Sequence, residues 1–171
     1  ANTERIRHLA GAAVMKDTPE AKRFLSLHKF ATEAHWYPDL KDLPASKSSI
    51  VSPKDIADML ASPHFDEVAP KEKATAFVFS VPEPAKQRRR SILWPKTVND
   101  ALRPQFTSQV KDCIGAAALA DYLCVRVFDL PAGFYQLPLS KSVQQFYVFE
   151  VAGEKYGINK VRMGVTWAPD D

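Results

Sequence analysis

Cysteine is scarce in this sequence of 171 residues. The two cysteines, Cys113 and Cys124, lie in an apolar region and are not spaced as a Cys-x-x-Cys pair, the pattern typical of zinc and redox sites. Such usage indicates reduced, structural cysteines, and it favours an intracellular protein. The four histidines are not spaced as metal ligands either, so we expect all of them on the surface or in the core.

Long apolar runs and glycine are also scarce. No run of about 18 apolar residues occurs, so we expect no segment to span a membrane. No secretory signal is recognisable. Six glycines against thirteen prolines indicate many rigid turns and short elements. The sequence begins at Ala1 without a methionine and stops directly after Asp170-Asp171, so we expect a fragment of a longer protein.

What the sequence does contain is typical of a globular protein. Hydrophobic residues make up 46% and charged residues 25%, and the length suits one domain, or one domain and part of another. The formal net charge of +3 permits a polyanionic partner without requiring one. Positive charge is concentrated in one short segment, which contains Lys86, Arg88, Arg89 and Arg90.

The first part of the chain has a helical pattern. Apolar residues recur at helical spacing over residues 1–36, and Thr18-Pro19-Glu20 is a helix start signal with Thr18 as the cap. Residues 38–52 have the composition of a linker. After them, Ser52 is expected to cap a short helix that extends to about Leu60.

From residue 74 the pattern becomes extended. Residues 76–81 predict a strand rich in β-formers, Pro82 to Ala85 are expected to end it, and residues 90–94 predict a second strand. The two strands predict a hairpin whose tip and returning arm carry the basic segment. Such a tip is either a charged, solvated surface or a clamp for phosphate, because guanidinium groups match phosphate oxygens in bidentate geometry.

A single carboxylate at a strand end is the second feature of chemical interest. A helix expected over residues 108–123 leads into an apolar run that ends on Asp129, and a turn through Pro131 and Gly133 follows. Hard divalent cations bind oxygen ligands, and a strand end fixes a ligand better than a loose loop does. The alternative is an ordinary strand end at which Asp starts a turn.

Four segments of the chain carry a resemblance to a known family. Phe128 to Leu139 resembles the first palm motif of reverse transcriptases, Asp-Leu-x-x-Gly-Tyr-x-Gln-Ile-Pro, and Gly164 to Pro169 is similar to the second, Gly-Leu-x-x-Ala-Pro. Between them, strands predicted at residues 146–151 and 156–161 match the family's aromatic hairpin. Arg88 to Asn99 resembles the fingers strand. The order resembles the fingers and N-terminal half of the palm of a retrotransposon enzyme, gypsy-like or tyrosine-recombinase-element-like.

The resemblance implies a fold class. It covers about residues 74–171, whereas residues 1–73 match no family that we can name. It implies an α+β fold of helices and antiparallel hairpins, truncated before the aromatic-x-Asp-Asp motif that completes the palm. The chain would divide into a helical region of unknown role at 1–73, a fingers-like basic hairpin at 74–107 and a partial palm at 108–171.

The resemblance also assigns roles to residues. Asp129 would bind both Mg²⁺ ions of a two-metal nucleotidyl transfer, assisted by the carbonyl of Leu130. Phe134 would be the plate beneath the sugar that excludes a 2′-hydroxyl, with plain core packing as the alternative. Met163 and Gly164 would line the nucleotide pocket or contact the template. The incoming triphosphate would be held by the basic segment, Arg90 with Lys86, Arg88 or Arg89. The implied partners are a template–primer of RNA or DNA and deoxynucleoside triphosphates.

Several departures from the family pattern bear on activity. Pro95 would interrupt the fingers strand, and Met163 stands where the family usually has Phe or Gln. The third palm motif is absent, and Asp170-Asp171 cannot replace it because no strand precedes them. One carboxylate cannot build a two-metal site, so we do not expect this chain to polymerise DNA by itself.

Two functions from different classes follow. The first is an enzyme, in which these residues are the N-terminal piece of an RNA-directed DNA polymerase. The second is a domesticated or degenerate relative without catalysis, which binds nucleic acid or acts as a scaffold in a ribonucleoprotein or protein complex. An aromatic-x-Asp-Asp hairpin roughly 20 to 40 residues beyond the second palm motif would favour the enzyme, because a two-metal palm needs those carboxylates.

Overall fold

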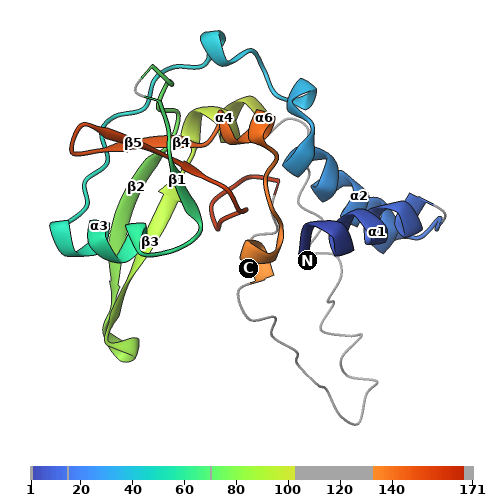
Figure 1. The fold of residues 1–171 in the computed structure, drawn as a ribbon, viewed down its shortest axis with the longest axis horizontal. Coiled ribbons are helices and arrows are strands. Elements are labelled where there is room, and N and C mark those ends of the chain that lie inside the picture. Colours follow the sequence, from blue (N-terminus) through green and yellow to red (C-terminus); the bar gives the residue numbers. More distant parts are fainter. Residues whose placement is uncertain (1, 15, 70, 103–132, 168–171) are drawn as a thin grey trace, which may run out of the picture.

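The computed structural model describes residues 2–14, 16–69, 71–102 and 133–167. Within them, a two-stranded and a three-stranded antiparallel sheet are flanked by helices (Figure 1). The predicted helix at 108–123 and the strand that ends on Asp129 lie outside the described residues. The mixed α and β content and the antiparallel sheets confirm the predicted fold class at this level.

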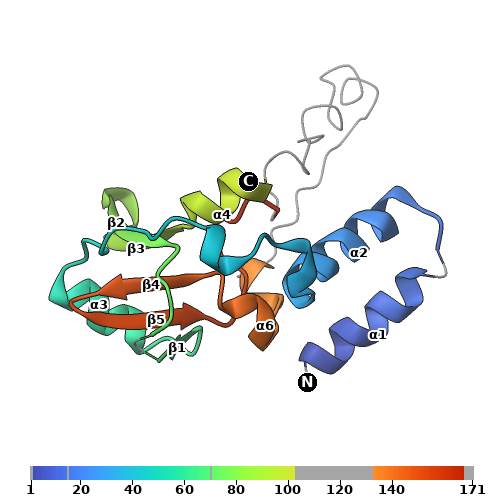
Figure 2. The same cartoon turned by 90° about the horizontal axis from the view of Figure 1, so that it is seen from above.

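Two N-terminal helices form an antiparallel pair at one side of the molecule, α1 (Asn2–Val14) and α2 (Pro19–Thr32) (Figures 1 and 2). Thr18 caps α2 as predicted, since its hydroxyl accepts a hydrogen bond from the Ala21 amide at 3.2 Å, and proline follows in the first turn. A short 3₁₀ helix, η1 (Ala34–Trp36), comes next. None of the helices in the described part of the chain is both long and apolar enough to cross a membrane.

Buried hydroxyl groups tie the helical pair to the rest of the fold. The Tyr37 hydroxyl donates to the Phe30 carbonyl at 2.7 Å and lies 3.1 Å from the Tyr147 hydroxyl. Trp167 Nε1 donates to the Tyr147 hydroxyl at 2.8 Å. Burial raises the pKa of both tyrosines, so both hydroxyls stay protonated. Ser140, before the short helix α6 (Lys141–Gln144), adds a bond from its amide to the Ala31 carbonyl.

The predicted basic hairpin is present and projects from the body of the fold (Figure 1). It consists of β2 (Phe77–Glu83), a 3₁₀ turn η3 (Pro84–Lys86) and β3 (Arg88–Trp94). The prediction that Pro82 ends the first strand is wrong, because Pro82 pairs with Arg89 inside the ladder. Both strands of a two-stranded ribbon are edge strands, and there a proline without an amide hydrogen is tolerated.

Strand β3, predicted to correspond to the fingers strand, ends where the sequence suggested an interruption. Pro95 follows β3 directly, and α4 (Lys96–Leu102) begins after it. Proline is compatible with a helix start but cannot donate to a sheet ladder. Asn99 therefore lies on a helix and is buried there together with Val98 and Leu102.

The second sheet has the strand order β1-β5-β4 and is antiparallel throughout. Strands β4 (Val148–Val151) and β5 (Glu154–Ile158) form the predicted aromatic hairpin. Its turn, Ala152-Gly153, has φ values of 53° and 82°, the left-handed pair that matches strand twist in a tight hairpin. Strand β1 (Phe65–Glu67) pairs with β5 and was not predicted.

Helix α3 (Pro53–Leu60) begins as predicted, with the Ser52 hydroxyl accepting from the Asp55 amide at 3.2 Å. The two sheets meet just before β2, because the amides of Thr75 and Ala76 both donate to the Val148 carbonyl at 2.9 Å. One apolar core, which includes Val78, Leu93, Phe149 and Ile158, lies between these elements. The division of the chain at residue 73 stays a prediction. Contacts cross it, since β1 belongs to the sheet of β4 and β5.

Candidate functional site

A cleft of about 660 Å³ lies between the basic hairpin and the second sheet. Five parts of the chain line it: the end of α3, β1, the hairpin and two short segments at 133–135 and 162–163. The residues that were predicted to bind nucleotide and that line it are Lys86, Arg88, Arg89, Arg90, Phe134 and Met163. Segments that are distant in sequence therefore share one concave surface, which is the usual form of a ligand site.

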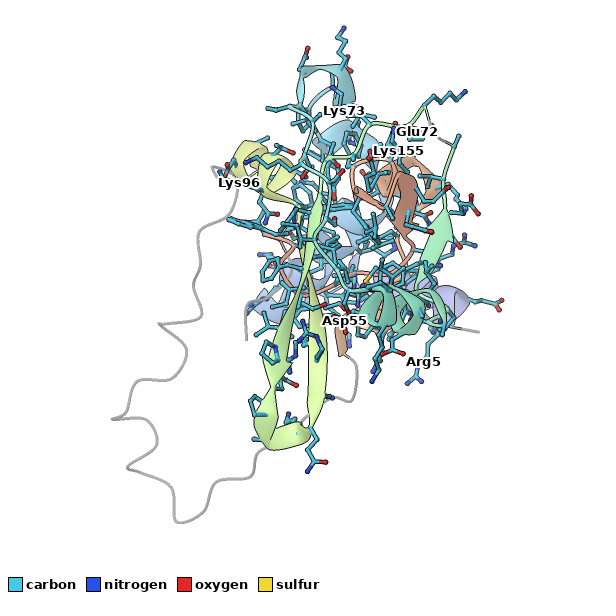
Figure 3. The ribbon with its side chains drawn as sticks, turned by 90° about the vertical axis from the view of Figure 1, so that its left-hand side faces the viewer. Arg5, Asp55, Glu72, Lys73, Lys96 and Lys155 are labelled. Carbon is cyan, nitrogen blue, oxygen red and sulfur yellow. The ribbon has the colours of Figure 1, made fainter. Side chains whose placement is uncertain are left out.

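The hairpin wall holds its arginines against carboxylates. Glu83 receives two of them, Arg88 Nε at 2.5 Å and Arg90 Nη2 at 2.8 Å. Arg89 Nε lies 2.8 Å from a carboxylate oxygen of Asp55 on α3, which lies beside the hairpin (Figure 3). Lys86 at the tip has no ion pair within the described ranges. The wall thus carries more positive than negative charge.

The charges on this wall are held in their ionised forms. The hydrogen bond from Arg88 and the charges of Arg88 and Arg90 keep the pKa of Glu83 below its usual value, against a smaller opposing effect of burial. Burial alone would raise the pKa of Asp55. Hydrogen bonds from Ser52, Arg89 and Ser80, with the charge of Arg89, outweigh it and lower the pKa. Both carboxylates are therefore negative at neutral pH.

The segment after the turn places two aromatic rings at the cleft. Gly133 to Gln136 form the 3₁₀ helix η6, and Phe134 and Tyr135 both line the cleft. Phe134 is half-buried and also packs against the core. The ring therefore contacts both the cleft and the core, so the two predicted roles, a plate beneath a sugar and core packing, are compatible with its position.

A buried arginine that was not predicted lies opposite the hairpin. Arg162 is 8% exposed and lines the cleft. Its guanidinium lies 4.3 Å from the Phe65 ring centre and 5.3 Å from that of Tyr135, and its Nη2 donates to the Tyr135 hydroxyl at 2.9 Å. Within the described residues no carboxylate is within ion-pair distance of it. Cation–π contacts of this kind are worth about 0.5–2 kcal/mol each.

His64 extends this stack. Its ring lies parallel to that of Tyr135, with centres 4.5 Å apart and an interplanar angle of 12°. Burial, and then the charges of Arg162 and Lys160, lower its pKa, so the imidazole is neutral at physiological pH. The sequence signal available for Arg162 was weak: one arginine between Val161 and Met163, two positions before the predicted Gly164.

Gly164 lies outside the residues that line the cleft, and it joins the two walls instead. Its φ is +101°, and a Cβ at this position would lie 2.3 Å from the Leu93 carbonyl oxygen of β3. Asn99 holds the same turn, because its Nδ2 donates to the Gly164 carbonyl at 2.7 Å and its Oδ1 accepts from the Thr166 amide at 2.9 Å. Backbone approach this close requires glycine.

The hairpin and the turn also meet through a side-chain contact. Arg90 Nη1 lies 3.7 Å from the sulfur of Met163, so the residues predicted in the fingers strand and before the second palm motif touch. Thioether sulfur is a weak acceptor, and this contact leaves the guanidinium available to a stronger one. At this point the basic hairpin and the segment that contains Met163, both predicted to bind nucleotide, contact each other.

The predicted metal ligands, Asp129 and the carbonyl of Leu130, lie outside the described residues. Among the residues that the structure describes, no group of three or more His, Cys, Asp or Glu side chains could hold a metal ion.

Comparisons with known proteins bear on the fold. No family model and no curated protein sequence matches the chain. It is similar to the prototype foamy virus protease–reverse transcriptase, at 20% identity and a TM-score of 0.52, over 72% of this chain and 17% of that one. It is also similar to a foamy viral protease–reverse transcriptase in complex with double-stranded DNA, at 18% identity and a TM-score of 0.55, over 72% and 23%.

At these identities the likeness shows the fold alone. The described elements have a reverse-transcriptase-like fold, and the chain spans less than a quarter of either viral chain. The resemblance seen in the sequence is confirmed at the level of this fold.

Proposed function

We propose that this chain is the fingers and the N-terminal part of the palm of a retrotransposon-type reverse transcriptase, and that its cleft binds template–primer and an incoming deoxynucleoside triphosphate. One observation carries the proposal: the basic hairpin, Phe134 and Met163 line a single cleft in a reverse-transcriptase-like fold. A similar viral protein was solved in complex with double-stranded DNA, which supports nucleic acid as the ligand class. Because folds host many functions, the cleft's chemistry has to carry the assignment.

The hairpin wall suits phosphate. Arg90 and Lys86 lie at the cleft, and Arg88 and Arg89 lie beside them. A phosphate group offers more acceptor oxygens and charge than Glu83 does, so it can take over the exposed guanidinium groups with little loss. We assign the triphosphate contact to Arg90, with Lys86, Arg88 or Arg89 as its neighbours, and we propose that the same cations contact backbone phosphates of the template–primer when no triphosphate is bound.

Phe134 is proposed as the residue that discriminates between sugars. Its half-buried ring is supported by the core on one side and borders the cleft on the other. A rigid ring beneath the sugar leaves no room for an extra 2′-oxygen. The core contact would fix the ring, as discrimination by shape requires.

Mg²⁺ is proposed at Asp129 and the Leu130 carbonyl. When bound, Mg²⁺ would neutralise charge that develops on the transferred phosphoryl group. Carboxylate and carbonyl oxygens are suitable ligands for this hard cation. Since two-metal transfer needs further carboxylates, we propose that catalysis also requires an aromatic-x-Asp-Asp segment, which this sequence does not contain.

Binding of an RNA–DNA primer–template, measured by fluorescence anisotropy over a range of salt concentrations, tests the proposal. The logarithm of the affinity should fall linearly with the logarithm of salt concentration, and Arg90→Gln should reduce the slope by about one. Lys47→Gln, an exposed cation away from the cleft, is the control and should leave the slope unchanged. A flat salt response of the unmodified chain contradicts the proposal.

Catalysis is tested on a protein extended to include the aromatic-x-Asp-Asp segment. It should extend a DNA primer on an RNA template with Mg²⁺, and Asp129→Asn should abolish extension. Phe134→Ala should raise the ratio of ribonucleotide to deoxynucleotide incorporation. Unchanged extension by the Asp129 variant would remove that residue from the metal site.

A second candidate is a non-catalytic module that binds nucleic acid or acts as a scaffold. It is favoured by the ion pairs of Arg88, Arg89 and Arg90, each of which already has a carboxylate partner. This arrangement would stabilise a hairpin that no longer meets a triphosphate. Extended protein that binds the primer–template without extending the primer would support this alternative.

A further inference from the structure

Arg162 is a buried cation at the edge of the cleft, and the described residues give it no counter-charge. The residue is 8% exposed, and no carboxylate in the described ranges forms an ion pair with it. The neighbouring acid, Asp66, lies near Lys141 and Asn159 instead. Buried arginines are almost always paired, because removing a charge from water is costly.

The surroundings of Arg162 hold the guanidinium without neutralising it. The rings of Phe65 and Tyr135 contact it, and the Tyr135 hydroxyl accepts one hydrogen bond at 2.9 Å. Its Nη1 is buried and has no hydrogen-bond partner in the described part of the chain. Aromatic rings and a hydroxyl orient the group but leave its positive charge intact, and one of its nitrogen atoms lacks an acceptor.

Arg162 lies where its positive charge can interact with a ligand in the cleft. It lines the same cleft as Arg90 but lies on the opposite wall. A positive charge in a partly water-excluded site attracts an anion in the adjoining cleft more strongly than an exposed one, because little solvent screens it. Unlike Arg88, Arg89 and Arg90, it is not paired with any carboxylate of the described residues that an incoming anion would have to displace.

We propose that Arg162 is a second phosphate-recognition residue of the cleft, oriented by Tyr135 and Phe65, so that one phosphate group is held between it and the hairpin wall. This inference rests on the proposed function and adds a residue to it. The shared ligand chemistry is a phosphate group, which is supplied either by the backbone of a nucleic acid or by a nucleoside triphosphate. Tyr135 is a positioning residue, since it acts through the guanidinium.

The experiment compares Arg162→Met with Arg162→Lys in the intact chain. Methionine keeps an apolar side chain between the rings but removes the charge, whereas lysine keeps the charge. The probes are a fluorescein-labelled RNA–DNA primer–template, deoxyadenosine triphosphate with Mg²⁺, and inorganic triphosphate. Affinity and its salt dependence are measured for each probe, together with the melting temperature of each variant.

The expected result separates recognition from folding. Arg162→Met should weaken at least one probe about tenfold and reduce the salt slope for the primer–template by about one if a backbone phosphate is bound. The melting temperature should stay unchanged or rise, because an unpaired buried charge is removed. Arg162→Lys should keep most of the salt slope. If Arg162→Met weakens binding of the two triphosphate probes but not of the primer–template, the nucleotide is the source of the phosphate.

Lys47→Met is the matched control, because it removes one positive charge outside the cleft. If Lys47→Met and Arg162→Met lost equal affinity for the probes, the effect would come from net charge alone, and the inference would be overturned. A lower melting temperature of Arg162→Met with unchanged affinity for every probe would also overturn the inference, because Arg162 would then have a structural role only. If Arg90→Gln weakens binding and Arg162→Met does not, the proposed function stands and this inference fails. If the unmodified chain binds none of the probes, both fail.

Tyr135→Phe provides a second variant that keeps the ring and removes only the hydroxyl that accepts from Arg162. Tyr135→Phe should weaken binding of the same probe as Arg162→Met does, by a smaller factor. The combined variant should lose no more affinity than Arg162→Met alone. Fully additive losses would show that Tyr135 does not act through Arg162.

Discussion

The two walls of the cleft hold positive charge in opposite ways. On the hairpin, the arginines are exposed or half-buried, and each has a carboxylate partner in Glu83 or Asp55. On the facing wall, Arg162 is buried between two rings and has no carboxylate partner within the described ranges. The same chemical group is therefore neutralised where water could have screened it and left charged where water is excluded.

This difference separates charge that supports the fold from charge that is available to a ligand. Exposed ion pairs contribute about 0–1 kcal/mol and exchange partners easily. A buried unpaired cation lowers stability, so its presence needs a reason other than folding. In the proposed function the hairpin would release its arginines to a phosphate, whereas Arg162 has no carboxylate partner among the described residues to release.

The contrast between the two walls of the cleft requires that they stay at a fixed distance from each other. The close approach of Gly164 to Leu93 of β3 holds them at that distance. Gly164→Ala should lower the free energy of unfolding by about 3 kcal/mol or more, because a Cβ meets the Leu93 carbonyl and φ is positive. Urea denaturation measures the loss. Gly11→Ala, in open space on α1, is the control and should raise stability by about 0.5–1 kcal/mol. Full stability of Gly164→Ala would contradict the described joint.

The hold of the rings on Arg162 is tested next. Phe65→Leu should lower stability by about 1–2 kcal/mol, through lost packing on Phe149 and the lost cation–π contact. In a chain that already carries Arg162→Met, the same change should cost less, since no cation remains. Denaturation of the four proteins in this cycle gives the coupling energy. Equal losses in both backgrounds would show that Phe65 does not hold Arg162.

A change at the tight turn of β4 and β5 tests whether stability alone alters the cleft. Ala152 has a φ of 53°, which costs alanine more than glycine, so Ala152→Gly should raise stability by about 0.5–1 kcal/mol. Because the turn lies outside both walls, affinity for the primer–template should not change. Thermal denaturation and anisotropy together check both statements, and a changed affinity would show that the walls depend on overall stability.

The smallest expected effect concerns the hairpin wall. Asp55→Asn removes the partner of Arg89 and should lower the melting temperature slightly at neutral pH, since Arg89 is half-exposed. The folded pKa of Asp55 is lowered, so its contribution is complete above the unfolded value of about 3.9 and is lost as pH falls through the folded value. The two proteins should therefore converge in acid. A difference that persists below both pKa values would exclude Asp55 ionisation as its source.

Local features of the fold were predictable from the sequence. The caps Thr18 and Ser52, the basic hairpin and the β4–β5 hairpin depend on short-range chemistry, and the structure contains all of them. Strand β1 was missed because it is three residues long and pairs with a strand about ninety positions later in the chain. The extension of β2 through Pro82 is tolerated because β2 pairs only with β3 in the two-stranded sheet of the described residues, and no local pattern records this.

The candidate site was predictable where a motif carried it. The motif segments placed Arg90, Phe134 and Met163 together, and the described cleft contains all three. Arg162 was not predictable, because its importance comes from what surrounds it: two rings, one hydroxyl and no carboxylate partner in the described residues. Asp129 lies outside the described residues and stays a prediction.

The most direct test of the central claim is the salt dependence of primer–template binding by the combined variant Arg90→Gln/Arg162→Met. If the two walls hold one phosphate together, the slope of log affinity against log salt concentration should fall by about one relative to the unmodified chain, and by no more than in either single variant, because both residues contact the same phosphate. An unchanged slope would show that the cleft does not bind phosphate through these walls.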